Sequence, residues 1–337
     1  MKKSFTLIEL ILSIVIGSIV LLFGITIMKQ VFDTQLKIKE YTKLLNRTNN
    51  VILLLEKNIQ NAVLNSVIVW KCNAQNNDCY NGNTNGFKSI QEVSSTEIKY
   101  YPVMEFLQRE PYSLEGKWNG SKIKTNINFI DLRDSKLINS NTSEYNISII
   151  DENLSEIANI IGEYNKYYTG TYNDPFANQD TVLLMSGSNG KGALDNIYNS
   201  YGYSNSKATS TNNKLFKINS YTLYSNKTIA NIIPITSNNQ TTIFEKFYFI
   251  NSNIAIVPKY NSSTQLYDLY LVHNFRSWKG QQYKDGKYEL IAKNVSNYSF
   301  KMTNGYMHIY LCLSNPFIKL ASGNYLNVCK EKYILNY

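Results

Sequence analysis

The sequence predicts an α+β protein in which one long N-terminal helix is followed by a largely antiparallel β domain. Three observations support this fold class. An uncharged apolar run occupies residues 10–28, a helical pattern of apolar residues follows it, and short alternating runs typical of strands fill the last hundred residues. The 337 residues suffice for a membrane anchor and one large domain.

The apolar run has the length of a membrane-spanning helix. Nineteen residues from Leu10 to Met28 carry no charge, and at about 1.5 Å per residue they nearly cross a hydrocarbon core of about 30 Å. A cleaved secretory signal would have a shorter apolar core and a small-residue exit, whereas Lys29 and Gln30 follow here. We therefore expect residues 5–28 to remain as a membrane helix.

The helix is expected to continue beyond the membrane through residues 29–66. Polar residues occupy the other faces of this segment, and the first proline of the chain is Pro102. The apolar stripe comprises Tyr41, Leu45, Ile52, Leu55, Ile59 and Ala62.

Residues 67–337 are expected to form the β-rich domain. Val67–Trp70 is typical of a first strand, and the segment Glu97–Tyr101 of another, while residues 150–165 have the acidic start of a short helix. Residues near 165–240 are predicted to be a loop-rich insertion, because 186–213 are rich in Ser, Asn and Gly.

The C-terminal hundred residues carry the clearest strand signals. Asn304-Gly305 between two alternating runs predicts a hairpin turn. In the second arm, Met307, Ile309, Leu311 and Leu313 are expected to face the core. The stretches typical of strands are IFEKFYFI, NIAIVP, LYDLYLV, YELIA and YSFKMTNGYMHIYLCL.

The four cysteines form two sequence-local pairs, Cys72 with Cys79 and Cys312 with Cys329. An even count after a membrane segment favours disulfides in an oxidising compartment. A metal site is the alternative, but neither spacing is the C-x2-C of zinc sites.

Charge and aromatic residues leave the choice of partner open. The formal net charge is +9, from 34 Lys and Arg against 25 Asp and Glu, which attracts nucleic acid, anionic lipid or an acidic partner. Codon bias and solubility are the favoured explanation. The segment Phe275–Lys279 combines aromatic and basic residues that suit single-stranded DNA, although a Tyr-rich sheet surface without a ligand explains it as well.

No pattern predicts catalysis, a cofactor or a metal. The S-x-x-K motif occurs at Ser188, Ser121 and Ser204 without the other motifs of its enzymes. Asp174 and Asp180 flank a loop that lacks EF-hand spacing. We expect a protein that is not an enzyme.

Two asparagines fit the bacterial glycosylation acceptor D/E-x-N-x-S/T. Asn146 lies in EYNIS and Asn153 in DENLS. In a chain so rich in asparagine about one such match arises by chance, so both are only candidates for modification.

Glu9 is the one charge between Phe5 and Met28. A carboxylate in an apolar span costs a few kcal/mol and indicates a functional residue. The segment KKSFTLIEL resembles the N-terminal signal of type IV pilins and type II secretion pseudopilins. The resemblance implies cleavage between Ser4 and Phe5, N-methylation of Phe5, and an assembly role for Glu9. Ser4 departs from the family, which usually has Gly there.

The resemblance also implies a location and partners. A minor pilin or pseudopilin sits in the inner membrane with its N-terminus cytoplasmic and its head periplasmic. Its partners are prepilin peptidase, other pilin subunits and an assembly platform, in a system for pili, secretion or DNA uptake (competence). The C-terminal sheet more loosely resembles large J-type or PilW-like subunits. A filament-tip binding module or adhesin that contacts DNA or a surface is the alternative function.

Overall fold

The structure is a computed structural model, and it describes most of the chain. The described residues are 7–72, 84–94, 97–109, 117–119, 122–124, 128–150, 154–185, 201–203, 214–224, 227–235, 243–303, 306–320 and 323–335.

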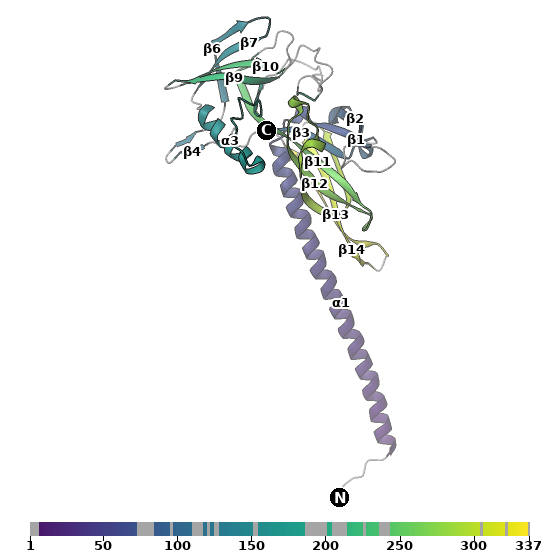
Figure 1. The fold of residues 1–337 in the computed structure, drawn as a ribbon. Coiled ribbons are helices and arrows are strands. Elements are labelled where there is room, and N and C mark those ends of the chain that lie inside the picture. Colours follow the sequence, from purple (N-terminus) through teal and green to yellow (C-terminus); the bar gives the residue numbers. More distant parts are fainter. Residues whose placement is uncertain are drawn as a thin grey trace.

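The first element is α1 (Leu7–Gln60), a single unbroken helix of 54 residues. Figure 1 shows its N-terminal part projecting away from the rest of the molecule, which we call the head. Residues 7–43 of α1 are exposed apart from the half-buried Glu40, and the buried positions begin at Leu44. At about 1.5 Å per residue α1 is about 80 Å long.

The amphipathic half of α1 is shorter than the sequence predicts. The helix ends at Gln60 instead of residue 66, and Tyr41, the first residue of the predicted stripe, is exposed. The side chains of α1 that the head buries are Leu44, Thr48, Val51, Ile52, Leu55 and Ile59.

The remaining elements are mainly strands. The strands are β1 (Ile68–Cys72), β2 (Thr84–Ser89), β3 (Val103–Arg109), β4 (Lys117–Asn119), β5 (Lys122–Lys124), β6 (Asn128–Asn139), β7 (Glu144–Ile150), β8 (Val182–Met185), β9 (Leu215–Leu223), β10 (Lys227–Pro234), β11 (Lys246–Asn261), β12 (Leu266–Phe275), β13 (Lys287–Thr303), β14 (Tyr306–Lys319) and β15 (Tyr325–Leu335). The helices besides α1 are α3 (Leu154–Thr169) and the 3-10 turns η1 (Leu64–Ser66), η2 (Ile90–Glu92), η3 (Ile98–Tyr100), η4 (Ser277–Lys279) and η5 (Tyr283–Asp285).

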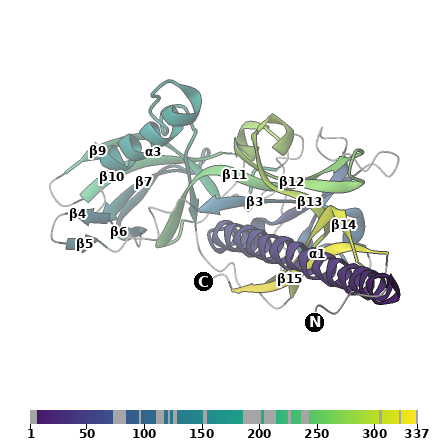
Figure 2. The same cartoon turned by 90° about the horizontal axis from the view of Figure 1, so that it is seen from below.

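Thirteen of the described strands belong to one sheet, and each of its pairings is antiparallel. One part, which we call the helix lobe, runs in the order β3-β11-β12-β13-β14-β15, with β1 pairing β3 and β2 pairing β1. Figure 2 shows α1 lying along this part of the sheet near β14 and β15. The predicted fold class, a long helix followed by an antiparallel β domain, is confirmed.

The other part, the barrel lobe, consists of β6–β10, α3 and the start of β11. Its strand order closes on itself, because β11 pairs with β6 at Lys246 and Phe247 and with β8 along Phe247–Ile250. Leu154 and Ala158 of α3 join the apolar core of this lobe. Within the range 165–240, predicted to be a loop-rich insertion, the described residues include the strands β8, β9 and β10.

Strand alternation gives the helix lobe two apolar faces. Ile254 and Ile256 of β11 join the core that α1 covers, whereas Ala255 and Val257 join the core on the opposite face. This alternation follows from the two-residue period of a strand, and it makes the central strand a wall between two cores.

The predicted C-terminal hairpin is present, although Asn304 and Gly305 themselves lie outside the described residues. β13 and β14 pair up to Thr303 opposite Tyr306. The four side chains expected in the core are buried, namely Met307, Ile309, Leu311 and Leu313.

The strand predicted at Glu97–Tyr101 is instead the turn η3. The carboxylate of Glu97 accepts hydrogen bonds from the backbone N–H and the hydroxyl of Ser94, at 3.3 and 3.0 Å. The first bond satisfies the backbone N–H of Ser94 just before the turn, and both favour the turn over an extended strand.

Burial on α1 predicts a sharp contrast between two leucines. Leu55 is 0% exposed and Leu53 is 58% exposed. We expect Leu55→Ala to lower the free energy of unfolding by about 2–5 kcal/mol, and Leu53→Ala to change it by less than about 0.5 kcal/mol. Urea denaturation of the full chain in detergent measures both, and equal losses would contradict the docking of α1 on the sheet.

Candidate functional site

The candidate site is the exposed part of α1 together with the contacts that attach α1 to the head. Ser4 and Phe5 lie outside the described residues. Glu9 is exposed in the first turn of α1, where the helix dipole favours an anion. It lies 35 residues before Leu44, where burial by the head begins, so about 53 Å of helix separate the two.

The surface around Glu9 is almost entirely apolar. Among the described residues, α1 alone is long and apolar enough to cross a membrane, and none of its most apolar window is buried. Such a surface is costly in water. It is stable only against lipid or another apolar surface.

At its other end α1 is held by β3. The backbone N–H of Arg109 donates to the carbonyl of Asn61 at 2.8 Å, and that of Val63 donates to Leu107 at 2.9 Å. The guanidinium of Arg109 donates through Nη2 to the carbonyls of Gln60 and Ala62, at 3.1 and 3.3 Å. A cation at the C-terminal end of a helix is also favoured by the helix dipole.

Arg109 is itself buried, and its guanidinium lies 5.1 Å from the centre of the Tyr248 ring. Sequence reasoning missed this role, because Arg109 and the helix end are 49 residues apart. They come together only because β3 pairs with the segment after α1, and no local sequence pattern predicts this pairing.

Two side-chain contacts fix how β14 and β15 lie along α1. Lys332 of β15 forms an ion pair with Glu56 at 3.0 Å. Nearer the membrane half, Asn315 of β14 donates to the Glu40 carboxylate at 3.3 Å. These polar contacts set the rotation and position of α1 on a sheet that otherwise contacts it through apolar side chains.

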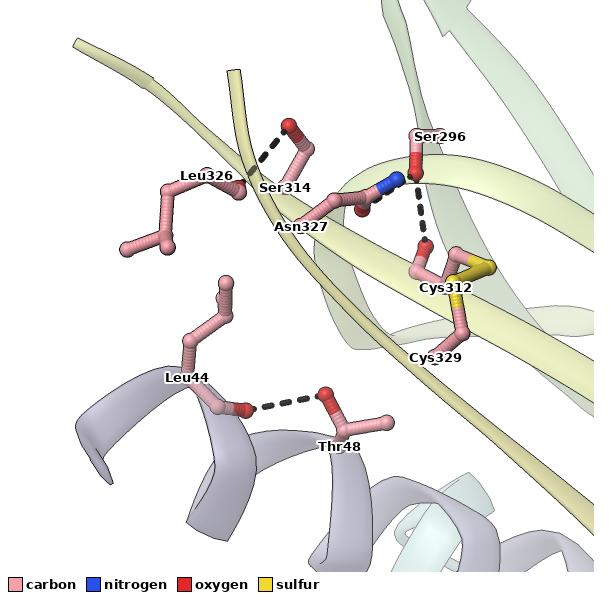
Figure 3. Close-up of a disulfide and its surroundings, with 8 residues drawn as sticks. All are labelled: Leu44, Thr48, Ser296, Cys312, Ser314, Leu326, Asn327 and Cys329. Atoms are coloured by element: carbon pink, nitrogen blue, oxygen red, sulfur yellow. Dashed lines mark hydrogen bonds between the residues drawn. A yellow bond between two sulfur atoms is a disulfide. The ribbon is translucent and has the colours of Figure 1, made fainter. Parts of the chain in front are cut away.

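A disulfide crosslinks the same two strands. Cys312 and Cys329 face each other in the β14–β15 register and are bonded. Figure 3 shows this bond between β14 and β15, and it shows Leu44 of α1 pointing toward the same strands. β15 is the last strand in the described order of this sheet, and β14 is its neighbour in that order. The disulfide therefore attaches to β14 the strand with which α1 makes its most extensive contact. Cys72 is also disulfide-bonded, while Cys79 lies outside the described residues.

A buried carboxylate lies on the face of the sheet opposite α1. Glu105 of β3 is 1% exposed. It accepts hydrogen bonds from Nε1 of Trp70 at 2.7 Å and from Nδ2 of Asn253 at 3.1 Å. Burial raises the pKa of Glu105 to about 8, and the two hydrogen bonds oppose this shift.

Tyr203 shares this buried environment. Burial raises the pKa of its hydroxyl well above the ordinary value, and the charge of Glu105 adds to the shift. Tyr203 therefore stays protonated while Glu105 titrates, and the pH dependence of this cluster belongs to the carboxyl group.

The segment considered for DNA binding, Phe275–Lys279, is engaged inside the head. Phe275 and Arg276 are buried. The ring N–H of Trp278 donates to the carbonyl of Gln179 at 2.9 Å, and Lys279 forms an ion pair with Asp180. These contacts join the connection after β12 to the loop before β8, so these aromatic and basic groups serve packing between the lobes.

The other candidate residues are placed as follows. Asp174 accepts hydrogen bonds from the backbone N–H groups of Phe176 and Ala177, at 2.9 and 3.3 Å. Among the described residues no group of three or more metal-ligating side chains is present. Asn146 is half-buried in the middle of β7, where it accepts a hydrogen bond from Asn231 at 3.2 Å. Asn153 lies outside the described residues.

Comparison with known proteins gives one match. Residues 1–25 match the prokaryotic N-terminal methylation motif. No curated protein and no solved structure matches the chain. The chain therefore carries a type IV pilin-like prepilin signal. Together with the exposed apolar half of α1, the signal fits a membrane-anchored protein with a single N-terminal span.

Because Cys312 and Cys329 are disulfide-bonded, we expect the free energy of unfolding to depend on redox conditions. Cys312 and Cys329 are 17 residues apart, and a loop of this size gives about 3 kcal/mol. We expect Cys312→Ser with Cys329→Ser to lower the free energy of unfolding by that amount under oxidising conditions, measured by urea denaturation. Under reducing conditions the variant and the parent should be equally stable. A difference that persists there would assign the loss to the serine side chains.

Because the pKa of Glu105 is raised in the folded protein, we expect the free energy of unfolding to fall as pH rises. The folded pKa of about 8 lies above the ordinary 4.5, so the unfolded chain loses its proton first. This contribution to stability is complete below about pH 4.5 and declines by about 1.4 kcal/mol per pH unit until about pH 8.

Urea denaturation at about pH 5 and about pH 8.5 tests this dependence. Glu105→Gln should flatten it, whereas Glu92→Gln, at an exposed position, should leave it unchanged. Parallel profiles for the parent and Glu105→Gln would refute the assignment.

Proposed function

We propose that the chain is a minor pilin or pseudopilin, cleaved by prepilin peptidase between Ser4 and Phe5, methylated on Phe5, and assembled into a periplasmic filament. The match of residues 1–25 to the N-terminal methylation motif carries this proposal. The filament serves a type IV pilus, a type II secretion system or a DNA-uptake system. The role is structural, not enzymatic.

The exposed half of α1 supports an assembly role. Residues 7–28 offer an almost entirely apolar surface that the head leaves exposed, and in a filament such surfaces pack against one another. Cleavage after Ser4 creates an ammonium group on Phe5, four residues from Glu9. A carboxylate in an apolar environment is tolerated when it is paired with a cation, and the Phe5 ammonium of a neighbouring subunit is the proposed partner.

The orientation follows from the disulfides and the leader. Disulfides persist in oxidising compartments such as the bacterial periplasm, and Cys312–Cys329 lies in the head. The head is therefore proposed to be periplasmic, with Lys2 and Lys3 on the cytoplasmic side as the positive-inside rule favours. The inner-membrane assembly platform is a further proposed partner.

A second candidate function is a binding module at the filament tip. Several apolar side chains are exposed on the barrel lobe, and exposed apolar side chains can form a binding surface. They are Phe129, Leu132, Leu137, Ile138 and Leu223. This function adds to the assembly role, because a tip subunit is anchored and processed in the same way.

Mass spectrometry of the N-terminal peptide tests the processing. From native membranes we expect a peptide that begins with N-methylated Phe5, and an uncleaved chain in cells that lack the peptidase. Ser4→Gly, which restores the usual residue of the family, should be cleaved at least as fully. An intact N-terminus that does not depend on the peptidase would refute the proposal.

Glu9 is tested by assembly at constant processing. Glu9→Gln removes the charge that pairs with Phe5, so the protein should be cleaved normally but should be lost from sheared filaments. Asp33→Asn is the matched control, since Asp33 is another exposed acid of α1 outside the apolar run. Equal incorporation of both variants would show that the Glu9 charge has no part in assembly.

A further inference from the structure

Glu105 lies beside an apolar core to which both lobes contribute. Trp70, whose ring N–H donates to the Glu105 carboxyl group, and Leu184 of β8 belong to this core. Three of the elements around the carboxyl group are strands of one sheet, namely β3 itself, β1 and β11. Antiparallel pairing on both sides holds β3 between the other two strands. The backbone hydrogen bonds of the sheet therefore keep these three neighbours in place.

A fourth neighbour of Glu105 is the segment 201–203, which belongs to no strand or helix. In the chain it lies between β8 and β9 of the barrel lobe, yet it packs on the helix lobe. The hydroxyl of Ser277 donates to the carbonyl of Tyr201 at 3.2 Å. The hydroxyl of Tyr203 is close enough to Glu105 for the charge of that carboxylate to raise its pKa. We call residues 201–203 the strap.

The middle residue of the strap is held closely against the backbone after β12. Gly202 has a φ of +75°, and a Cβ at this position would lie 2.9 Å from the Cα of Trp278. Glycine adopts this left-handed conformation without steric cost, whereas other residues do not. The closed position of the strap therefore depends on contact with Trp278 that leaves no room for a side chain at residue 202.

A chain of hydrogen bonds connects Glu105 to the strap. Asn253 donates through Nδ2 to the carboxyl group of Glu105 at 3.1 Å. The Oδ1 atom of Asn253 accepts from the backbone N–H and the hydroxyl of Ser277, at 3.1 and 3.2 Å. A hydroxyl carries one hydrogen, so Asn253 and the carbonyl of Tyr201 share the hydroxyl of Ser277. A change at Glu105 thus reaches the strap through two side chains.

No cation offsets a negative charge on Glu105 among the residues that the structure describes. Burial is the main cause of its raised pKa, and no neighbouring charge opposes it. The cations of the surrounding elements bind the end of α1 or Asp180, and they are Arg109, Arg276 and Lys279. The other titratable groups nearby are the hydroxyls of Tyr201, Tyr203 and Tyr283. An ionised Glu105 would be a buried carboxylate with two neutral donors, which is a costly state.

We propose that Glu105 acts as a pH-dependent latch: its neutral carboxyl group keeps the strap closed, and loss of its proton releases the strap so that water reaches the carboxylate. The strap moves because the sheet does not hold it, whereas β1, β3 and β11 stay paired. The pKa of about 8 places this opening in a mildly alkaline medium. The latch belongs to the head alone, so it stands apart from the proposed role in a filament.

Hydrogen exchange of the full chain in detergent, measured by mass spectrometry, tests the latch. The measured quantity is the exchange rate of a peptide that contains the strap, divided by the rate of a β14 peptide around the fully buried Ile309. Both peptides share the pH dependence of chemical exchange and of global unfolding, so the ratio reports local opening. The parent is compared with Glu105→Gln, which cannot ionise, at about pH 6.5 and about pH 9.

We expect the ratio for the parent to rise about tenfold or more between these two pH values, because ionisation of Glu105 opens the strap in the folded protein. Glu105→Gln should keep the low ratio at both pH values. Gly202→Ala provides the open reference, since its Cβ would clash with Trp278, and its ratio should be high at both.

Trp70→Phe tests the latch without replacing Glu105. The hydrogen bond from Trp70 lowers the pKa of Glu105, so its removal should move the rise of the ratio to higher pH. A midpoint that stays in place or moves to lower pH would overturn the proposal. The same conclusion follows if the ratio for the parent is independent of pH, because pH then acts only on global unfolding. An equal rise in Glu105→Gln would show that another group controls the strap.

Discussion

The docking of the last turns of α1 on the helix lobe is the interaction on which the rest of the structure depends. Leu55 and Ile59 are almost completely buried against β-strand side chains such as Ile256 and Leu311. Each surface would face water without the other, because the helix has one apolar stripe and this face of the sheet is apolar. Burial of this kind is strong but not directional, so polar contacts must set the position.

Three polar contacts provide that position. Arg109 binds the carbonyls at the end of α1, Lys332 pairs with Glu56, and Asn315 binds Glu40. They are spread over the whole contact between the helix and the head, and the Cys312–Cys329 bond holds together the two strands that provide the last two. The direction in which the exposed half of α1 leaves the head is therefore fixed by the fold. This matters for any subunit that must present this half to its neighbours in one orientation.

The sequence predicts the parts of this fold that depend on local pattern. The unbroken helix follows from an apolar run, a stripe and the absence of proline before Pro102, and the C-terminal hairpin follows from alternation and Asn304-Gly305. The barrel lobe escapes such reasoning, because β8, β9 and β10 lie among polar loops and their pairing closes over long sequence separations. The same applies to the site: the prepilin signal is a local pattern that the sequence shows directly, whereas the contact of Arg109 with the end of α1 is visible only in the folded structure.

Glu105 in the head and Glu9 on α1 are both carboxylates in apolar surroundings, and their environments differ. Glu105 sits in an apolar core, and the fold accommodates it with two donated hydrogen bonds and a pKa raised by burial. The solution lies within the head and is complete in a single subunit. Glu9 lies on the apolar part of α1, far along the helix from any side chain of the folded head. Its surroundings among the described residues are the exposed apolar surface of α1 itself, which fits a membrane span. In the proposed function this carboxylate takes part in assembly, so the proposed role and the long exposed helix depend on the same segment of the chain.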